Sequence, residues 1–405
     1  MVQPRTFDDL VPQDHPVRAV WALVQRWDLT RFLQGIRARG TRPGRAATDP
    51  QLLIALWLYA TIEGIGCGRE LARRCIESDP YKWLRGAVSL NYHTLNDFRV
   101  DHEEALDDLL TQMIAVLTHA QIVSLERIAQ DGTRIRTSAG ANSFKEREPL
   151  EKHLEAARVH LETIKQSAAD PTLSAQQKAA RERGARERQE RLEQALVELE
   201  KVERAKAQQK DKPTKDRPAR ASSTDPEARM MRMPDGGTRP AYNLELATAC
   251  DSRAIVGVAM TNAGSDAGQD APMRDQVEER TDEAVEEQLM DGGFVTLEAI
   301  ERAAVEEVTV YAPVPKPRKA GVDRHVPKAT DSAAVAEWRQ RMGTTAAKKL
   351  YKQRSSTIET INGELKDQRG LGRLVVRGLR KVQCLALWAA LAYNMVHFGP
   401  ILLSG

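Results

Sequence analysis

Apolar residues recur every three or four positions through the first 120 residues, a spacing typical of amphipathic helices. One such stripe begins at Val17. A second follows Asp49-Pro50, a pair that favours a helix start because proline fits the first helical position. Two shorter stripes are separated by the break Ser78-Asp79-Pro80. The pattern therefore predicts an all-helical N-terminal domain over residues 1–120.

From residue 121 the pattern changes to short apolar runs that are typical of strands. The first run, residues 122–131, is predicted to end at Asp131. The runs on either side of Asp251 are predicted to pair as a hairpin. Strands that alternate with helices indicate an α/β fold, a mixed sheet flanked by helices. The remaining predicted strands are residues 288–291 and 308–314.

Residues 146–219 interrupt this pattern with charge-rich helical sequence. Leucines fall on one seam in each half of the segment, and Ser174 with Gln177 forms a capping box that starts the second helix. The segment ends in a lysine- and proline-rich stretch that predicts a basic linker, residues 210–218. We therefore predict a helical hairpin inserted into an α/β domain that comprises residues 121–145 and 220–398.

The net charge of +3 is small for 405 residues, but its distribution is uneven. Residues 31–45 and 338–381 are strongly basic, whereas residues 266–307 are strongly acidic. Separated patches of charge suit a protein with a polyanionic partner. The helices around the Ser78 break are also similar to a helix–turn–helix, although a structural helical domain with basic faces fits equally well.

The four cysteines include no Cys-x-x-Cys pair, which argues against a zinc site. The N-terminus has no basic-then-apolar signal, and no uninterrupted apolar run of about 20 residues is evident. We therefore expect a soluble, intracellular protein without a membrane span.

Three carboxylates stand where they could share divalent metal ions. Asp131 and Asp291 each precede a glycine at a predicted strand end, where the glycine lets a phosphate approach the backbone closely. Glu359 lies in the helical C-terminal segment and could pack across those strand ends. Two metal ions about 4 Å apart stabilise the attacking and leaving oxygens of phosphoryl transfer, and magnesium prefers carboxylate oxygens. Each Asp-Gly pair alone is more typical of a turn, so the hypothesis depends on the combination.

The spacing of the polar residues near Glu359 indicates which of them could lie on the same face of a helix as Glu359. Lys366 lies seven residues on, at nearly the same angle around a helix, so it could hold a substrate phosphate beside the carboxylate. Glu364, the alternative carboxylate, points roughly 140° away from Glu359. Arg354 is five residues before Glu359 and faces the same site only if the helix begins or bends within residues 355–357.

These residues give the chain a family resemblance. Tyr351, Arg354, Glu359 and Lys366 resemble the Tyr-Arg-Glu-Lys signature of bacterial insertion-sequence transposases, which have an RNase H-like DDE catalytic domain. One more residue separates Arg354 from Glu359 than in the commonest form of the signature. Asp291 follows a polar stretch where the family has a strongly apolar strand. The resemblance also rests on Asp131-Gly132-Thr133, residues 223–229, Tyr242-Asn243, residues 262–266, Asp291-Gly292-Gly293-Phe294, and residues 377–382 and 392–394.

The resemblance implies that Asp131, Asp291 and Glu359 are catalytic residues and metal ligands, with two Mg²⁺ or Mn²⁺ ions as cofactors. It implies cleavage at transposon ends and transfer of the 3′-hydroxyl to target DNA, with double-stranded DNA bound by a homodimer or higher oligomer. One alternative is an inactive relative that binds or bridges DNA as a regulator. Another is an RNase H-like nuclease that does not join strands. The expected DNA contacts are Tyr351, Arg354, Lys366, Arg377 and Lys381.

Overall fold

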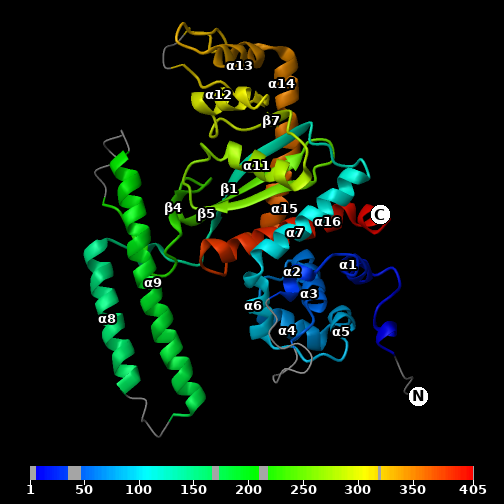
Figure 1. Cartoon of the computed structure of the whole chain (residues 1–405), viewed down its shortest axis with the longest axis vertical. Coiled ribbons are helices and arrows are strands. Elements are labelled where there is room, and N and C mark those ends of the chain that lie inside the picture. Colours follow the sequence, from blue (N-terminus) through cyan, green and yellow to red (C-terminus); the bar gives the residue numbers. More distant parts are fainter. Residues whose placement is uncertain (1–5, 35–46, 167–172, 209–217, 318–320, 405) are drawn as a thin grey trace.

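The computed structural model of the chain describes residues 6–34, 47–166, 173–208, 218–317 and 321–404. Its N-terminal part is helical, as predicted (Figure 1). Asp49 begins the third helix as expected, because its Oδ1 accepts a hydrogen bond from Gln51 N at 2.9 Å and Pro50 takes the first helical position. The elements of this part are the 3₁₀ turn η1 (Phe7–Leu10) and the helices α1 (Pro16–Val24), α2 (Thr30–Leu33), α3 (Pro50–Ile62), α4 (Gly68–Glu77), α5 (Asp79–Arg85), α6 (Tyr92–Asp101) and α7 (Glu103–His119).

A six-stranded mixed sheet forms the centre of the molecule, which confirms the predicted α/β class (Figure 1). Its central strand pairs antiparallel with β5 on one side and parallel with β7 on the other. β7 in turn pairs parallel with β8. β5 also pairs antiparallel with β4 and β6, and the β5–β6 hairpin around Asp251 is the predicted one. The strands are β1 (Arg127–Arg136), β4 (Arg229–Arg232), β5 (Thr238–Ala249), β6 (Ile255–Thr261), β7 (Glu287–Leu289) and β8 (Thr309–Tyr311).

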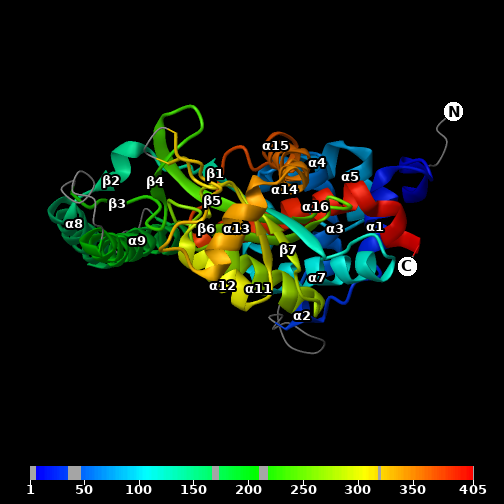
Figure 2. The same ribbon diagram turned by 90° about the horizontal axis from the view of Figure 1, so that it is seen from above.

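Helices cover both faces of this sheet (Figure 2). The helix that follows β6 packs on β5 and β6, and the turn before α15 packs on β1 and β5. The central strand is therefore enclosed between C-terminal helices on one face and the acidic segment on the other. These elements are α11 (Asp270–Thr281), α12 (Leu297–Val305), α13 (Ala333–Gly343), α14 (Thr345–Tyr351), the π-helical turn η4 (Ser355–Glu359), α15 (Thr360–Gln368) and α16 (Leu379–Ser404).

Strand β1 continues past Asp131, so the prediction that Asp131 ends its strand is wrong. The register pairs Asp131 with Leu246, and pairing extends to Arg136 opposite Ala241. The partner strand β5 is 12 residues long, and its unbroken ladder keeps β1 extended through the Asp-Gly pair. Strand pairing at this position outweighs the preference of Asp-Gly for turns.

The insertion forms the predicted helical hairpin, which projects from the sheet beside β4 (Figure 1). Its two helices are α8 (Arg147–Gln166) and α9 (Ala175–Gln208), and α9 begins with the predicted capping box. Ser174 N donates to Gln177 Oε1 at 2.9 Å, and Gln177 N donates to Ser174 Oγ at 3.2 Å. Arg229 on β4 anchors the hairpin through its ion pair with the buried Glu198, at 2.5 Å. The buried leucines of the seam are Leu150, Leu154, Leu161, Leu192 and Leu199.

Two small elements join the hairpin to the sheet. They are the strands β2 (Phe144–Lys145), which follows the 3₁₀ turn η2 (Ala141–Ser143), and β3 (Ala221–Ser222), which comes after α9. The two strands pair antiparallel. Both ends of the insertion are therefore held together by backbone hydrogen bonds. Most of the predicted basic linker and the basic residues 35–45 lie outside the described residues.

Helix α16 joins the helical part to the sheet. It packs against α3 and α7 on one side and against β6 on the other. Trp388 Nε1 donates to Arg99 O at 3.1 Å, and the Asn394 amide exchanges hydrogen bonds of 3.0 and 2.9 Å with the backbone of Ile255. By length and composition α16 could cross a membrane, an apolar helix that the sequence-based expectation overlooked. Because 78% of its apolar window is buried, it forms the core between the two parts.

Candidate active site

The carboxylate of Asp131 is held by the C-terminal helical segment. Arg354 Nη2 donates to Asp131 Oδ1 at 2.6 Å, and Asn362 Nδ2 donates to Asp131 Oδ2 at 2.9 Å. The Asp131 side chain is only 15% exposed. Burial raises its pKa, the neighbouring carboxylates Asp291 and Asp266 raise it further, and Arg354 opposes the shift. Strand β1 and the C-terminal helical segment therefore meet at the carboxylate of Asp131.

The π-helical turn η4 explains how Arg354 reaches this carboxylate. A π-helical turn forms hydrogen bonds between residues five apart and is wider than an α-helical turn. Arg354 and Glu359 are five apart, and Arg354 Nη1 lies 3.5 Å from Glu359 Oε1. The helix therefore departs from regular α-helical geometry where a bend or a helix start was predicted, but it does so through a wider turn over residues 355–359. The additional residue of the signature is accommodated as a wider turn, and one guanidinium bridges Asp131 and Glu359.

The two glutamates of α15 and its preceding turn face different surroundings. Glu359 is 57% exposed beside Arg354. Glu364, the alternative carboxylate, pairs elsewhere: its Oε1 accepts from Arg369 Nη2 at 2.6 Å and its Oε2 lies 3.0 Å from His397 Nε2. This arrangement agrees with the large angle expected between them.

Strand β7 forms despite its polar sequence, but it ends at Leu289, so Asp291 lies two residues beyond the strand end at which it was predicted. The strand is stabilised because Gln288, fully buried, donates through Nε2 to Gln130 Oε1 at 2.7 Å on the central strand. Asp291 Oδ1 accepts from Gly293 N at 2.6 Å. A Cβ at Gly293 would lie 2.9 Å from Asp291 Oδ1 and 3.0 Å from Asp266 Oδ2, so both carboxylates border this glycine.

A buried polar network behind Asp131 was missed by sequence reasoning. Because side chains alternate along a strand, Gly132 and its partner Glu245 face the side opposite to Asp131. Asn243 Nδ2 donates to Glu245 Oε1 at 2.6 Å and to Asp266 Oδ1 at 2.7 Å. Burial, and then the charge of Asp266, raise the pKa of Glu245 to about 8. The available signal was Asn243 and Glu245, two polar residues on one face of β5 with apolar residues on either side of Glu245.

Three of the five expected DNA contacts, Tyr351, Arg354 and Lys366, lie at the carboxylates. Lys366 Nζ donates to Thr133 Oγ1, two residues after Asp131, and burial lowers the pKa of Lys366. Tyr351 is half-buried, and burial raises the pKa of its phenol. Together with Arg354 they border the same cluster of acidic groups.

The other two expected DNA contacts, Arg377 and Lys381, lie elsewhere. They line a cleft of about 1090 Å³ between α6, α9 and the segment that leads into α16. Tyr92 and His93 at the start of α6 and Arg191 of α9 line the same cleft. The expected contacts therefore fall into two groups, one at the carboxylates and one where the N-terminal helices meet the hairpin.

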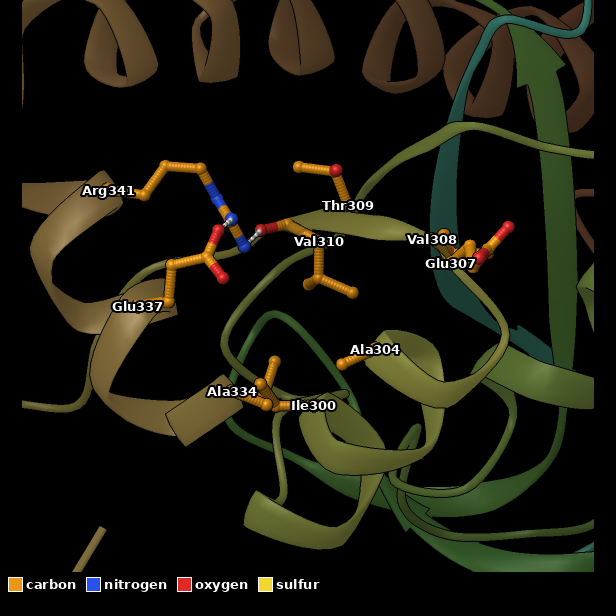
Figure 3. Close-up of a pocket in the computed structure, with 9 residues that line it drawn as sticks. All are labelled: Ile300, Ala304, Glu307, Val308, Thr309, Val310, Ala334, Glu337 and Arg341. Atoms are coloured by element: carbon orange, nitrogen blue, oxygen red, sulfur yellow. Dashed lines mark hydrogen bonds and ion pairs between the residues drawn. The ribbon is translucent and has the colours of Figure 1, made fainter. Parts of the chain in front are cut away.

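A smaller hollow of about 180 Å³ lies between α12, β8 and α13 (Figure 3). Arg341 on its wall is already engaged, since Nη1 donates to Glu337 Oε1 at 2.7 Å and Nη2 donates to Val310 O at 3.4 Å (Figure 3). Its volume is below the roughly 300 Å³ of small-molecule sites. None of the expected site residues lines it.

Within the described ranges, no group of three or more His, Cys, Asp or Glu side chains is assembled as a metal site. Asp131 and Glu359 do not face each other directly, because the Arg354 guanidinium lies between them and pairs with both. A site with these residues requires a cation to replace that guanidinium.

Carboxylates that hold two metal ions occur in nucleases, polymerases and phosphatases. Comparison with known families agrees: residues 5–101 match the family described as transposase domain (DUF772), and residues 316–398 match the family described as transposase DDE domain. The two matches support the assignment of the chain to the insertion-sequence DDE transposases, which its C-terminal signature resembles. No curated protein and no solved structure matches the chain.

Proposed function

We propose that this transposase cleaves transposon ends and joins the freed 3′-hydroxyl to target DNA through Asp131, Asp291 and Glu359. The observation that carries the proposal is the contact of Asp131 with the segment that holds Glu359, through the bridging Arg354. Asp291 is close enough to raise the pKa of Asp131. The mixed sheet with helices on both faces is consistent with an RNase H-like catalytic domain over residues 121–145 and 220–398.

The donor atoms at this place suit divalent metal. Carboxylate oxygens are the hard ligands that Mg²⁺ and Mn²⁺ prefer. A positive charge is already favoured here, since Arg354 pairs with both Asp131 and Glu359. Two ions held by Asp131, Asp291 and Glu359 would stabilise the attacking and leaving oxygens of the displaced phosphate.

The basic side chains would bind the DNA backbone. An arginine displaced from carboxylates can hold a phosphate through two parallel hydrogen bonds, a role that fits Arg354 once a metal ion replaces it. Lys366, held against Thr133, would place its ammonium beside Asp131. Arg377 and Lys381 would contact a more distant part of the transposon end in the cleft beside α6. Each of these is a proposed DNA contact.

The test is cleavage of DNA that carries the element's own ends, with Mg²⁺ or Mn²⁺. Asp131→Asn and Glu359→Gln should each abolish cleavage. Glu364→Gln is the matched control on the same helix, because Glu364 pairs with Arg369 and His397 instead of Asp131, and it should cleave. Retained cleavage by either of the first two variants contradicts the proposal.

The same assay separates the alternatives. Joined products distinguish a transposase from a nuclease that only cuts. Wild-type protein that binds the ends but cleaves with neither metal would indicate a DNA-binding regulator. Light scattering with and without DNA ends tests the expected homodimer or higher oligomer.

A further inference from the structure

Asn362 is placed beside the carboxylates and is not part of the signature. It follows Glu359 by three residues and precedes Lys366 by four, so the three share a face of the helix. The residue is 7% exposed. Its Nδ2 donates to Asp131 Oδ2 at 2.9 Å. Its Oδ1 is buried and has no hydrogen-bond partner within the described part of the chain.

The orientation of this amide is determined by Asp131. A carboxylate only accepts hydrogen bonds, so the amide nitrogen must face Asp131 and the amide oxygen must point elsewhere. Buried carbonyl oxygens are nearly always paired. Arg354 directs Nη1 and Nη2 to Glu359 and Asp131, so these groups do not satisfy the Asn362 oxygen.

We infer that Asn362 Oδ1 is a further ligand of the divalent cation held by Asp131. The inference rests on the proposed function, because it concerns the same metal site. Amide oxygens are hard, neutral ligands that Mg²⁺ and Ca²⁺ accept together with carboxylates. One side chain would thus orient Asp131 through its nitrogen and bind the cation through its oxygen. A neutral ligand also adds no negative charge to a site that already contains Asp131, Asp291 and Glu359.

Binding of Mn²⁺ to the full-length protein without DNA tests this inference, measured by loss of the free Mn²⁺ signal in electron paramagnetic resonance. Asn362→Leu keeps the branching of the side chain but removes both polar atoms, and its affinity for Mn²⁺ should fall roughly 10- to 100-fold, as for other changes beside metal ligands. Asn362→Asp also loses the hydrogen bond to Asp131 but keeps an oxygen ligand, so it should bind Mn²⁺ more tightly than Asn362→Leu does. Asn142→Leu, at an exposed asparagine of η2, is the matched control and should bind as wild type does.

Each result of the Mn²⁺ binding assay supports or contradicts the inference about Asn362. If Asn362→Leu binds Mn²⁺ as wild type does while Asp131→Asn does not, the inference is wrong and the proposed function stands. If Asn362→Asp binds as weakly as Asn362→Leu, the residue only positions Asp131, which also overturns the inference. If wild type and Asp131→Asn show the same weak binding, the metal site itself is wrong. Urea unfolding without metal, measured for every variant, identifies loss of binding that comes from loss of the fold.

Discussion

Replacing Gly132 by alanine would place a methyl group inside the polar network behind Asp131. The added Cβ would lie 2.6 Å from Asp266 Oδ1, 2.8 Å from Glu245 Oε1 and 3.1 Å from Asn243 Nδ2. These three side chains are 6%, 1% and 0% exposed and are bonded to one another, so they cannot retreat without breaking hydrogen bonds. Overpacking of this kind costs about 1–3 kcal/mol of unfolding free energy.

Gly140→Ala is the matched control for this prediction. Nothing lies within 4 Å of a Cβ at Gly140, and its φ of -85° suits any residue. Its unfolding free energy should therefore stay within about 0.5 kcal/mol of wild type. Urea unfolding followed by tryptophan fluorescence should give a lower midpoint with an unchanged slope for Gly132→Ala only. Equal midpoints for the two variants would refute the close packing of Gly132 against the network.

Two further predictions concern the network and the π-helical turn. Burial raises the pKa of Glu245 from 4.5 to about 8, so its stabilisation is complete below pH 4.5 and is lost as the pH rises toward 8. Glu245→Gln should therefore flatten the fall of unfolding free energy over that range, and an unchanged fall would contradict the assignment. Deleting Ser356 should close η4 into an α-helical turn in which Arg354 and Glu359 are four apart and still paired, with the melting temperature kept. Deleting Gly363 should lower the melting temperature because it rotates Lys366 away from Glu359, and equal losses for both deletions would count against the wider turn.

Local patterns were sufficient to predict most elements. The cap at Asp49, the capping box at Ser174 and the leucine seam of the hairpin depend on residues a few positions apart, so the sequence displays them directly. Helical geometry also showed that a regular α-helix could not bring Arg354 and Glu359 to one site, and the structure has the wider turn η4 between them. These features are set by neighbours in the chain.

Which residues meet at the site depends on contacts between distant parts of the chain, and no local sequence pattern predicts those contacts. Asp131 meets Arg354 across 223 residues and Asn362 across 231 residues. Asp131 was placed at a strand end because Asp-Gly favours turns, and only pairing with β5 shows that the strand continues. Glu245 likewise accepts a hydrogen bond from Gln130 on β1, and its neighbour Asn243 bonds Asp266 in a loop, so its burial could not be foreseen from β5 alone.

The wider turn η4 has a consequence for how related sequences are compared. A helix can take up one additional residue locally while the segments on either side keep their own contacts. The interval between Arg354 and Glu359 therefore does not measure the distance between their side chains, since the five-residue interval here ends in a direct contact. An alignment that enforces the commoner interval would select Ile358, which has no carboxylate, in place of Glu359. The ion pairs of Arg354 with Asp131 and Glu359 identify the corresponding glutamate better, because they show which carboxylates lie close together in the structure.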